Sequence, residues 1–369
     1  MTHRIAVARA LAETGAEIHV AVPADHVWAP DDFSIDEIEK AGFKLHTIPL
    51  SRRGKNVLQD VRTFLSIFSL IRHTRPNVVH LFTIKPVIYG GIAARILGVK
   101  AVISTITGLG HVFITQGPIN SLVRVLVVSL YRIATGHSNS RVIVQNSGDA
   151  ETLVRVGAVH CEKIRLVPGS GVDLTNFPVT QEPDDIPLVI LPSRLIWDKG
   201  VGEFAKAANA IEKRGISCRF ALVGDTRASN PRAVPEKIIR EWVGEGFLEW
   251  WGRRTDMPEV YAQSAIVCLP TTYGEGVPKV LIEAAASSRA IVATNIAGCR
   301  EIVQHGGNGL LVPPRDSDAL VEALIELISD PERRAKMGRK GREIVSAGMT
   351  EEHVIASTLD VYREVTDLS

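Results

Sequence analysis

Short apolar runs alternate along the chain with longer stretches whose apolar residues have helical spacing. A parallel sheet with helices on both faces gives this alternation, because its strands are buried on both sides and each crossover between them is a helix. The sequence therefore predicts an α/β fold with two series of strands. The expected strands are Glu17–Val22, Leu45–Pro49, Asn77–Phe82, Ala101–Ile106, Arg141–Gln145 and Lys163–Val167 in the first series, and Pro187–Pro192, Cys218–Val223, Phe247–Trp251, Ala265–Leu269, Ala290–Ala293 and Gly309–Val312 in the second.

Polar residues separate the two series at Pro178–Pro187, a segment that begins and ends with proline. Such a composition is typical of a linker. We expect two doubly wound domains, 1–180 and 187–347, and a C-terminal helix over 348–369 that packs back toward the first domain. Ligands of doubly wound domains bind outside the carboxyl ends of the strands, so the chemistry is expected in the loops there.

Composition and charge restrict the class of protein. With 45% hydrophobic and 22% charged residues, and no apolar run near the roughly 18 residues of a membrane span, the sequence is typical of a soluble protein. The four cysteines are scattered, which favours the reducing cytoplasm. Residues 1–180 hold 19 Lys and Arg against 13 Asp and Glu, or +6, and the remainder holds 23 against 28, or −5. The first half should therefore prefer anionic partners, although solvated surface charge explains the count equally well.

The segment YGEGVPKVLIE directly follows a predicted strand of the second series. Gly276 lets the backbone approach a ligand closely, and Pro278 suits the first turn of a helix whose free N–H groups would point at an anion such as a diphosphate. Glu275 precedes that helix and Glu283 lies two turns along it, so one carboxylate can reach a sugar and the other a ribose. Two carboxylates at this spacing also occur by chance on many surface helices, and the position after a strand favours the site.

The segment PSRLIWDKG is a second strand exit that leads into a helix. Arg194 offers a planar fork for phosphate oxygens, and Lys199 offers a mobile point charge. Together they could neutralise a departing diphosphate. Gly224 and Arg253 follow two further strands of the same series, so four loops should converge on one rim of the second domain.

These motifs occur in a fixed order along the second half: PSRLIWDKG, LVGD, EGVPKVLIEA with its Glu-x7-Glu pair, TNIAGCREIV and GNGLLVPPRD. In this the chain resembles glycosyltransferase family 4, whose members have the GT-B architecture of two Rossmann-like domains facing a cleft. The first half is similar to the subgroup that acts on polyprenyl-diphosphate-linked sugars, through HLFTIKPVIYGGIAARILGVK and TITGLGHVF.

The resemblance implies a retaining transfer of a sugar, such as an N-acetylhexosamine, from a nucleoside-diphosphate donor, with UDP expected. The acceptor would be a lipid-linked or saccharide group in cell-surface polysaccharide or glycan synthesis. Arg194 and Lys199 would hold the diphosphate, Glu275 the donor sugar and Glu283 the ribose, and the backbone around Arg253 would meet the base. The full set implied is Glu275, Arg194, Lys199 and His111 as catalytic, Glu283, Gly276, Val277, Pro278, Gly224 and Arg253 as donor-binding, and Lys85, Gly108 and Gly110 as acceptor-binding.

Two of these first-half residues, His111 and Lys85, can also be explained without a role in binding. His111 follows a glycine-containing loop, where it could contact the transferred sugar or could be a tolerated polar residue. Lys85 lies at another strand exit, where it could bind an acceptor phosphate or could be a solvated lysine before a turn. His80 lies within an apolar strand and is interpreted as a hydrogen-bonded core histidine.

No metal or other cofactor is predicted. Asp316, Ser317 and Asp318 form an acidic triplet, but they stand directly before the apolar-periodic helix Ala319–Ile328, where Asp316 or Ser317 would be the N-cap. Cationic side chains at the two strand exits would replace a metal at the phosphates. The expected partners are the nucleotide sugar and an acceptor, not nucleic acid. Two alternatives stay open: a nucleotide-sugar 2-epimerase of the same architecture, and a non-catalytic nucleotide-sugar binding protein.

The stretch Ile119–Ala134 has the spacing of a helix that is apolar around most of its circumference. Its polar residues, among them Arg124 and Arg132, fall within an arc of about 140°. Such a helix is either buried under the sheet, which is the commoner case, or lies against lipid. A basic stripe in the positively charged half also suits a bilayer that holds a lipid-linked acceptor, so peripheral attachment to the cytoplasmic face of a membrane is a second expectation.

The first residues differ from the family pattern, because a helix-like stretch, His3–Thr14, precedes the strand at Glu17. The strand and glycine-containing loop expected before that helix would be central in a doubly wound sheet. We expect a further segment upstream, of roughly 15–25 residues, enough for one strand and its turn. On this expectation the 369-residue form is less stable and less active than a longer one.

Overall fold

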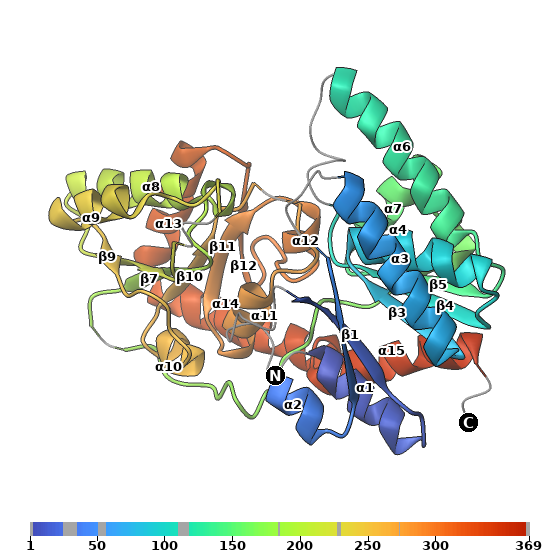
Figure 1. Ribbon diagram of the computed structural model, residues 1–369. Coiled ribbons are helices and arrows are strands. Elements are labelled where there is room, and N and C mark those ends of the chain that lie inside the picture. The colour runs from blue at the N-terminus through green and yellow to red at the C-terminus, as the bar shows by residue number, and fades with distance from the viewer. Residues whose placement is uncertain are drawn as a thin grey trace. The chain divides into compact units, whose positions relative to one another are not determined.

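The computed structural model describes residues 3–24, 35–50, 57–109, 118–183, 185–226, 230–272 and 274–366. The chain divides into two compact units (Figure 1). The first unit comprises Met1–Ser170 and Glu352–Ser369, and the second comprises Gly171–Glu351.

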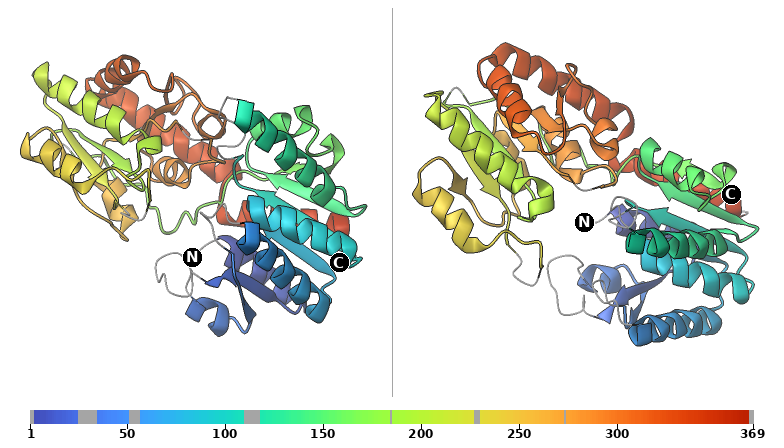
Figure 2. Two further views of the ribbon diagram at one scale, coloured as in Figure 1. Left: turned by 45° about the horizontal axis from the view of Figure 1, so that its top comes forward. Right: turned by 90° about the horizontal axis from the view of Figure 1, so that it is seen from above.

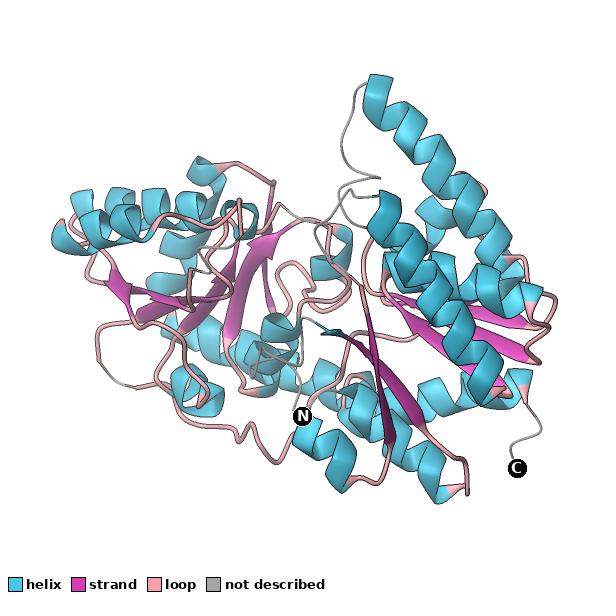
Figure 3. Ribbon diagram, in the orientation of Figure 1, coloured by secondary structure: helices cyan, strands magenta, loops and turns pink. Residues whose placement is uncertain are grey.

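The second unit is built on one parallel sheet with the strand order β12-β11-β10-β7-β8-β9. Its strands are β7 (Leu188–Pro192), β8 (Arg219–Val223), β9 (Glu249–Trp250), β10 (Ile266–Leu269), β11 (Ala290–Thr294) and β12 (Gly309–Val312). Helices cover both faces (Figure 3), and successive strand residues alternate between two apolar clusters: Val189 packs toward α8, α9 and α13, whereas Ile190 packs toward α10, α11 and α12. The helices are α8 (Val201–Lys213), α9 (Glu236–Gly244), α10 (Met257–Ala262), α11 (Lys279–Ala286), α12 (Ala297–Arg300), α13 (Ser317–Ile328) and α14 (Pro331–Gly348).

The first unit contains a four-stranded parallel sheet, β3-β4-β5-β6, and a separate parallel pair, β1-β2. The strands are β1 (His19–Pro23), β2 (Lys44–Ile48), β3 (Val78–Phe82), β4 (Ala101–Ile106), β5 (Ser140–Val144) and β6 (Ile164–Leu166). One face of the four-stranded sheet packs against the adjacent helices α3, α4 and α6, and the other against α1 and α15 (Figure 2). The helices are α1 (His3–Glu13), α2 (Ile35–Lys40), α3 (Val57–Thr74), α4 (Ile84–Ile96), α6 (Pro118–Thr135), α7 (Ser147–Arg155) and α15 (Glu351–Val365).

The fold class predicted from the sequence is confirmed. Each expected strand overlaps an observed one, and both sheets of more than two strands are entirely parallel. The reason is burial: β4, β7 and β11 are buried at every position, so their sequences are short and mainly apolar, with only serine and threonine as polar residues.

The strands of the first unit form two sheets because, among the described residues, β1 is paired with β2 alone and β3 with β4 alone. Helix α1 packs on both: Ile5 lies in a cluster with Val22, and Val7 lies in a cluster with Ile103. The central strand that the sequence leads us to expect before α1 stays a prediction.

The segment expected to be a linker is part of the second unit instead. Buried Arg289 donates to the backbone oxygen of Thr180 at 3.0 Å, and buried Arg334 forms an ion pair with Glu182. The second unit therefore begins at Gly171 rather than after Pro178–Pro187. Composition could not indicate this, because the arginines that hold the segment lie more than 100 residues away along the chain.

The C-terminal helix α15 packs on the first unit. Val354 and Val361 join the apolar cluster beneath β4 and β5, and Tyr362 lies 3.0 Å from Nδ1 of His80. Glu364 accepts hydrogen bonds from Arg141 and Arg165, both at 2.6 Å, and these bonds, with that from Arg165 contributing most, hold the pKa of Glu364 down at about 2. The carboxylate is therefore charged at neutral pH and fixes the end of the helix to β5 and β6.

Candidate functional site

The loops at the carboxyl ends of β7, β8, β10 and β11 pack directly on one another. A Cβ atom added to Gly224 would lie 1.8 Å from the backbone oxygen of Ser193, and one added to Gly298 would lie 1.6 Å from that of Gly276. Only glycine permits such approach of two backbones. The loops that carry the predicted site residues therefore form one rigid rim at the edge of the second sheet.

The β7 exit loop is fixed by backbone hydrogen bonds on both sides. Leu195 N–H donates to Asp225 at 3.0 Å, and the N–H of Thr272 and the hydroxyl of Thr271 donate to the backbone oxygen of Asp198 at 2.8 and 3.0 Å. The side chain of Arg194 is exposed at this loop. Lys199 ends the short turn that leads into α8, where the side chain points back toward the β10 exit.

The central polar contact of the rim is an ion pair between Lys199 and Glu275. Lys199 Nζ lies 2.5 Å from Glu275 Oε1, and the side chains are only 12% and 17% exposed. The Thr271 hydroxyl lies 3.1 Å from the same carboxylate oxygen, so its one hydrogen is shared between Glu275 and the backbone oxygen of Asp198. The structure thus brings together two of the residues that the sequence predicts to be catalytic, and each offsets the cost of burying the other's charge.

Helix α11 begins four residues after Glu275, at Lys279. Gly276, Val277 and Pro278 are buried, and Pro278 precedes the first helical residue, Lys279, without any side-chain cap at that end. The first N–H groups of a helix have no intrahelical partners and carry partial positive charge, so this end favours an anion. Three sources of positive potential, α11, Lys199 and Arg194, therefore lie along neighbouring loops.

The second carboxylate of the motif, Glu283, is nearly enclosed. Tyr261 OH donates to Glu283 Oε2 at 2.9 Å, and Lys279 Nζ lies 3.2 Å from Oε1. Burial, and next the Glu283 charge, raise the pKa of Tyr261 well above its usual value, so the phenol stays protonated and can donate. Sequence reasoning missed Tyr261, because it lies on another helix, α10, 22 residues before Glu283, and no motif of the sequence links the two.

Two further predicted residues lie at the adjoining strand exits. Gly224 N–H donates to the backbone oxygen of Gly252 at 2.7 Å, and Trp250 Nε1 donates to the oxygen of Gly224 at 2.9 Å. Arg253 follows Gly252 and is exposed. The exits of β8 and β9 are thus tied together, as the sequence led us to expect for neighbouring strands.

The acceptor-binding prediction is only partly covered by the described residues. Lys85 follows β3, lies 2.7 Å from Asp60 and is about as buried as that partner. Thr83, just before it, has φ 71° and ψ 166°, a strained conformation for a residue with a Cβ. Gly108 follows the adjacent strand β4 with φ 143°. Gly110 and His111 lie outside the described residues.

The acidic triplet has the structural role proposed for it as the alternative to metal binding. Asp316 is the N-cap of α13, and its Oδ1 accepts the N–H of Ala319 at 2.9 Å. Over the ranges of the chain that the structure describes, no cluster of three His, Cys, Asp or Glu side chains is arranged to hold a metal ion.

Comparison with known proteins gives the family. Residues 186–330 match the model described as "Glycosyl transferases group 1", and residues 1–146 match "Glycosyl transferase 4-like". The chain therefore belongs to the group 1, family 4-like glycosyltransferases. Sucrose-phosphate synthase of Thermosynechococcus elongatus superposes on this glycosyltransferase with a TM-score of 0.79 at 19% identity, covering 98% of this chain and 92% of the other, which identifies the fold as GT-B.

Two relatives with named activities cover most of the glycosyltransferase. The N,N'-diacetylbacillosaminyl-diphospho-undecaprenol α-1,3-N-acetylgalactosaminyltransferase of Campylobacter jejuni is 25% identical, over 96% of this chain and 92% of the relative. The UDP-Gal:α-D-GlcNAc-diphosphoundecaprenol α-1,3-galactosyltransferase of Escherichia coli is 26% identical, over 77% of this chain and 74% of the relative. The resemblance to family 4 is confirmed, as is the expectation of an enzyme rather than a binding protein.

Replacing Gly298 with alanine should separate the β10 and β11 exit loops, because the new methyl group would collide with the backbone oxygen of Gly276. We expect Gly298→Ala to lower the free energy of unfolding by about 1–3 kcal/mol and to reduce turnover by displacing Glu275. Chemical denaturation and initial rates would measure both.

Gly244→Ala is the matched control, since Gly244 is in α9 and a Cβ there meets no atom within 4 Å. It should raise stability by up to about 1 kcal/mol, because alanine has the higher helix propensity. If Gly298→Ala is as stable and active as the Gly244→Ala variant, the rim is not held by backbone contact.

Proposed function

We propose that this enzyme transfers a sugar from a UDP-linked donor, with retention of anomeric configuration, to a polyprenyl-diphosphate-linked acceptor. The observation that carries the proposal is the ion pair of Lys199 and Glu275 near the N-terminus of α11, with Arg194 exposed on the same β7 exit loop as Lys199. This arrangement presents positive charge for a diphosphate and a carboxylate for sugar hydroxyls within one rim.

The cations act on the leaving group. As the bond from the anomeric carbon to the diphosphate oxygen breaks, negative charge accumulates on the diphosphate, where Lys199, Arg194 and the α11 N–H groups stabilise it. Without a ligand, Glu275 compensates the charge of Lys199. A bound diphosphate offers Lys199 a second anionic partner, which releases part of the carboxylate's hydrogen-bonding capacity for the sugar.

The acceptor oxygen forms its bond on the face from which the diphosphate departs. A phosphate oxygen of the leaving group accepts the proton of the incoming hydroxyl, so no side chain has to act as general base. Glu283 contacts the ribose and the backbone beside Arg253 contacts the uracil, while His111 contacts the transferred sugar. No metal is required, because the cationic groups supply the positive charge at the phosphates.

Donor and acceptor classes rest on the two named relatives. The Escherichia coli enzyme is named for a UDP-linked donor, and both relatives are named for acceptors linked to undecaprenol through a diphosphate. The basic first half of the chain suits such an acceptor, and Lys85 at the β3 exit is its proposed contact.

We propose that the enzyme reaches this acceptor by docking on an anionic membrane through the layer of α3, α4 and α6. Within the described residues no helix could span a membrane. Yet large apolar side chains are exposed on α3 and α6: Val57, Leu58, Val61, Leu65, Val125, Leu126 and Ile133. Other side chains of α6 belong to the core of the first unit, among them the fully buried Tyr131, so one part of the circumference of this helix is buried and another is exposed.

The charge of the same layer favours anionic lipid. Its basic residues are Arg62, Arg72, Lys85, Arg95, Arg124 and Arg132. Its one acidic residue, Asp60, is paired with Lys85, so the three helices carry six positive charges against one negative, or +5. Apolar insertion and attraction to anionic lipid act together at such a surface.

Loss of either cation should slow the reaction. We expect Lys199→Ala and Arg194→Ala each to lower kcat/KM by at least about a hundredfold, since each removes a charge that acts on the leaving group. Release of UDP from a panel of UDP-sugars, with a polyprenyl-diphosphate-linked acceptor present, would measure the loss of activity.

The control is Lys206→Ala, which replaces an exposed lysine on α8. Near-parental turnover in either test variant contradicts the assignment, and epimerised donor formed without acceptor would indicate the epimerase instead.

Activity should survive chelation. In excess EDTA the initial rate of UDP release is expected to stay within about twofold of the untreated rate, because protein cations hold the diphosphate. Complete loss of UDP release in EDTA, restored by magnesium or manganese, would show that a metal ion binds the diphosphate.

Removal of apolar side chains from α3 should weaken membrane binding. The double variant Val57→Ser, Val61→Ser is expected to partition at least about tenfold less into vesicles of mixed phosphatidylglycerol and phosphatidylcholine, given about 0.8 kcal/mol per buried methylene. Vesicle co-sedimentation measures the change. The control is Val179→Ser, Val243→Ser, which removes two exposed valines from the second unit. Equal binding by both double variants, or no parental binding, contradicts the membrane surface.

A further inference from the structure

Tyr261 is a fully buried residue near the end of α10 whose hydroxyl contacts Glu283. Its ring packs in the apolar core of the second unit, and the centre of the Phe177 ring lies 6.0 Å away. Its backbone oxygen accepts hydrogen bonds from Arg289 Nε at 2.7 Å and from the Ser264 hydroxyl at 2.9 Å. The ring and the backbone of Tyr261 are therefore both held, so its hydroxyl has a fixed position beside α11.

The hydroxyl of Tyr261 has one hydrogen and two acceptors within reach. Glu283 Oε2 is 2.9 Å away, and the backbone oxygen of Val280 is 3.3 Å away. The carboxylate is both the nearer and the stronger acceptor, so the hydrogen goes to Glu283. Oε2 of Glu283 therefore has its partner inside the core.

The two oxygens of Glu283 have different surroundings. The partner of Oε2 is fully buried, whereas the partner of Oε1, Lys279 at 3.2 Å, has a side chain that is 56% exposed. Oε1 is therefore the oxygen on the side of the surface, where a ligand can share it with the lysine. Loss of the phenol hydroxyl would leave a charged, nearly enclosed oxygen without its donor, which is costly, so the carboxylate would turn toward Lys279 or toward water.

We propose that Tyr261 is a positioning residue that fixes Glu283 for the selection of a ribonucleotide: the phenol holds Oε2, and Oε1 accepts a ribose hydroxyl. This inference rests on the proposed function, in which Glu283 contacts the ribose. A buried acceptor built for a hydroxyl strongly rejects an analogue that lacks it, because the acceptor is then left without its donor. The preference for ribose thus depends on a tyrosine that is buried too deeply to touch the nucleotide.

Direct binding tests this role and needs no turnover. Calorimetry would measure the affinity of the full chain for UDP and for 2′,3′-dideoxy-UDP, and the ratio of the two affinities is the ribose preference. We expect a preference of at least about a hundredfold in the parent. Tyr261→Phe, which removes the hydroxyl and keeps the ring, should decrease this preference at least about tenfold. On a Glu283→Ala background the same change should alter the preference by less than about twofold, because the phenol acts only through that carboxylate.

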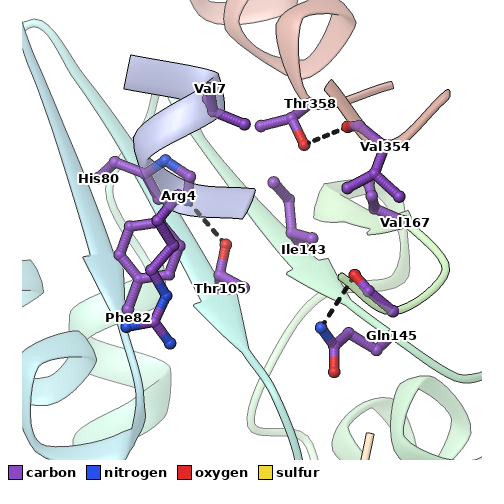
Figure 4. Close-up of a pocket in the computed structure, with 11 residues that line it drawn as sticks. Arg4, Val7, His80, Phe82, Thr105, Ile143, Gln145, Val167, Val354 and Thr358 are labelled. Carbon is purple, nitrogen blue, oxygen red and sulfur yellow. Dashed lines mark hydrogen bonds between the residues drawn. The ribbon is translucent and has the colours of Figure 1, made fainter. Parts of the chain in front are cut away.

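Tyr362→Phe is the matched control. Tyr362 is also a buried tyrosine, and its hydroxyl lies 3.0 Å from Nδ1 of His80, whose Nε2 lies 2.7 Å from the Thr105 hydroxyl (Figure 4). The substitution thus removes a comparable buried hydrogen bond from the first unit, and it should keep the parental ribose preference. Melting curves would set a measuring temperature at which every variant is folded.

The possible results distinguish this role from the proposed function. If the parent does not prefer UDP, the ribose contact of Glu283 is wrong, and the role of Tyr261 fails with it. If the parent prefers UDP and Tyr261→Phe keeps that preference, or loses affinity for both nucleotides equally, only the positioning role is overturned.

Discussion

The ion pair between Lys199 and Glu275 is the contact on which the rim at the edge of the second sheet depends. It joins the β7 exit to the β10 exit, and both partners are largely withdrawn from water. Either charge alone in that position would be costly, so each residue requires the other until a ligand arrives. In the proposed reaction a diphosphate would supply a new anion for the lysine, and a sugar would supply new donors for the carboxylate. The same pair joins the two loops, and on our proposal it also selects a diphosphate-linked sugar.

The loops around this ion pair are held in place by direct contacts between their backbones. Gly224 and Gly298 allow loops to touch without intervening side chains, and buried strands hold the loops' ends. Cations fixed in advance need little rearrangement as charge develops on the leaving group, which is how such sites lower a barrier. The first unit uses its charge differently: a basic, partly apolar helical layer of α3, α4 and α6 is the surface that we propose to meet an anionic lipid.

The sequence could predict those features that depend on a short segment of the chain, and not those that depend on contacts between remote segments. Strands such as Leu188–Pro192 are short, continuous apolar runs, and Asp316 is a cap next to its helix, so both were predictable. Lys199 and Glu275 were predicted as site residues, but their pairing across 76 positions was not. Tyr261 and the arginines that bind Thr180 and Glu182 act through contacts between remote segments, which no local pattern records.

The anomeric configuration of the product tests the central claim most directly. Purified enzyme would be incubated with an α-linked UDP-sugar and a polyprenyl-diphosphate-linked acceptor, and proton NMR would read the coupling constant of the new anomeric proton. If the phosphate-stabilising rim directs attack to the face that the diphosphate leaves, the product is α-linked. A β-linked product would contradict this account, because inversion requires attack from the opposite face and a general base that the proposed mechanism does not contain.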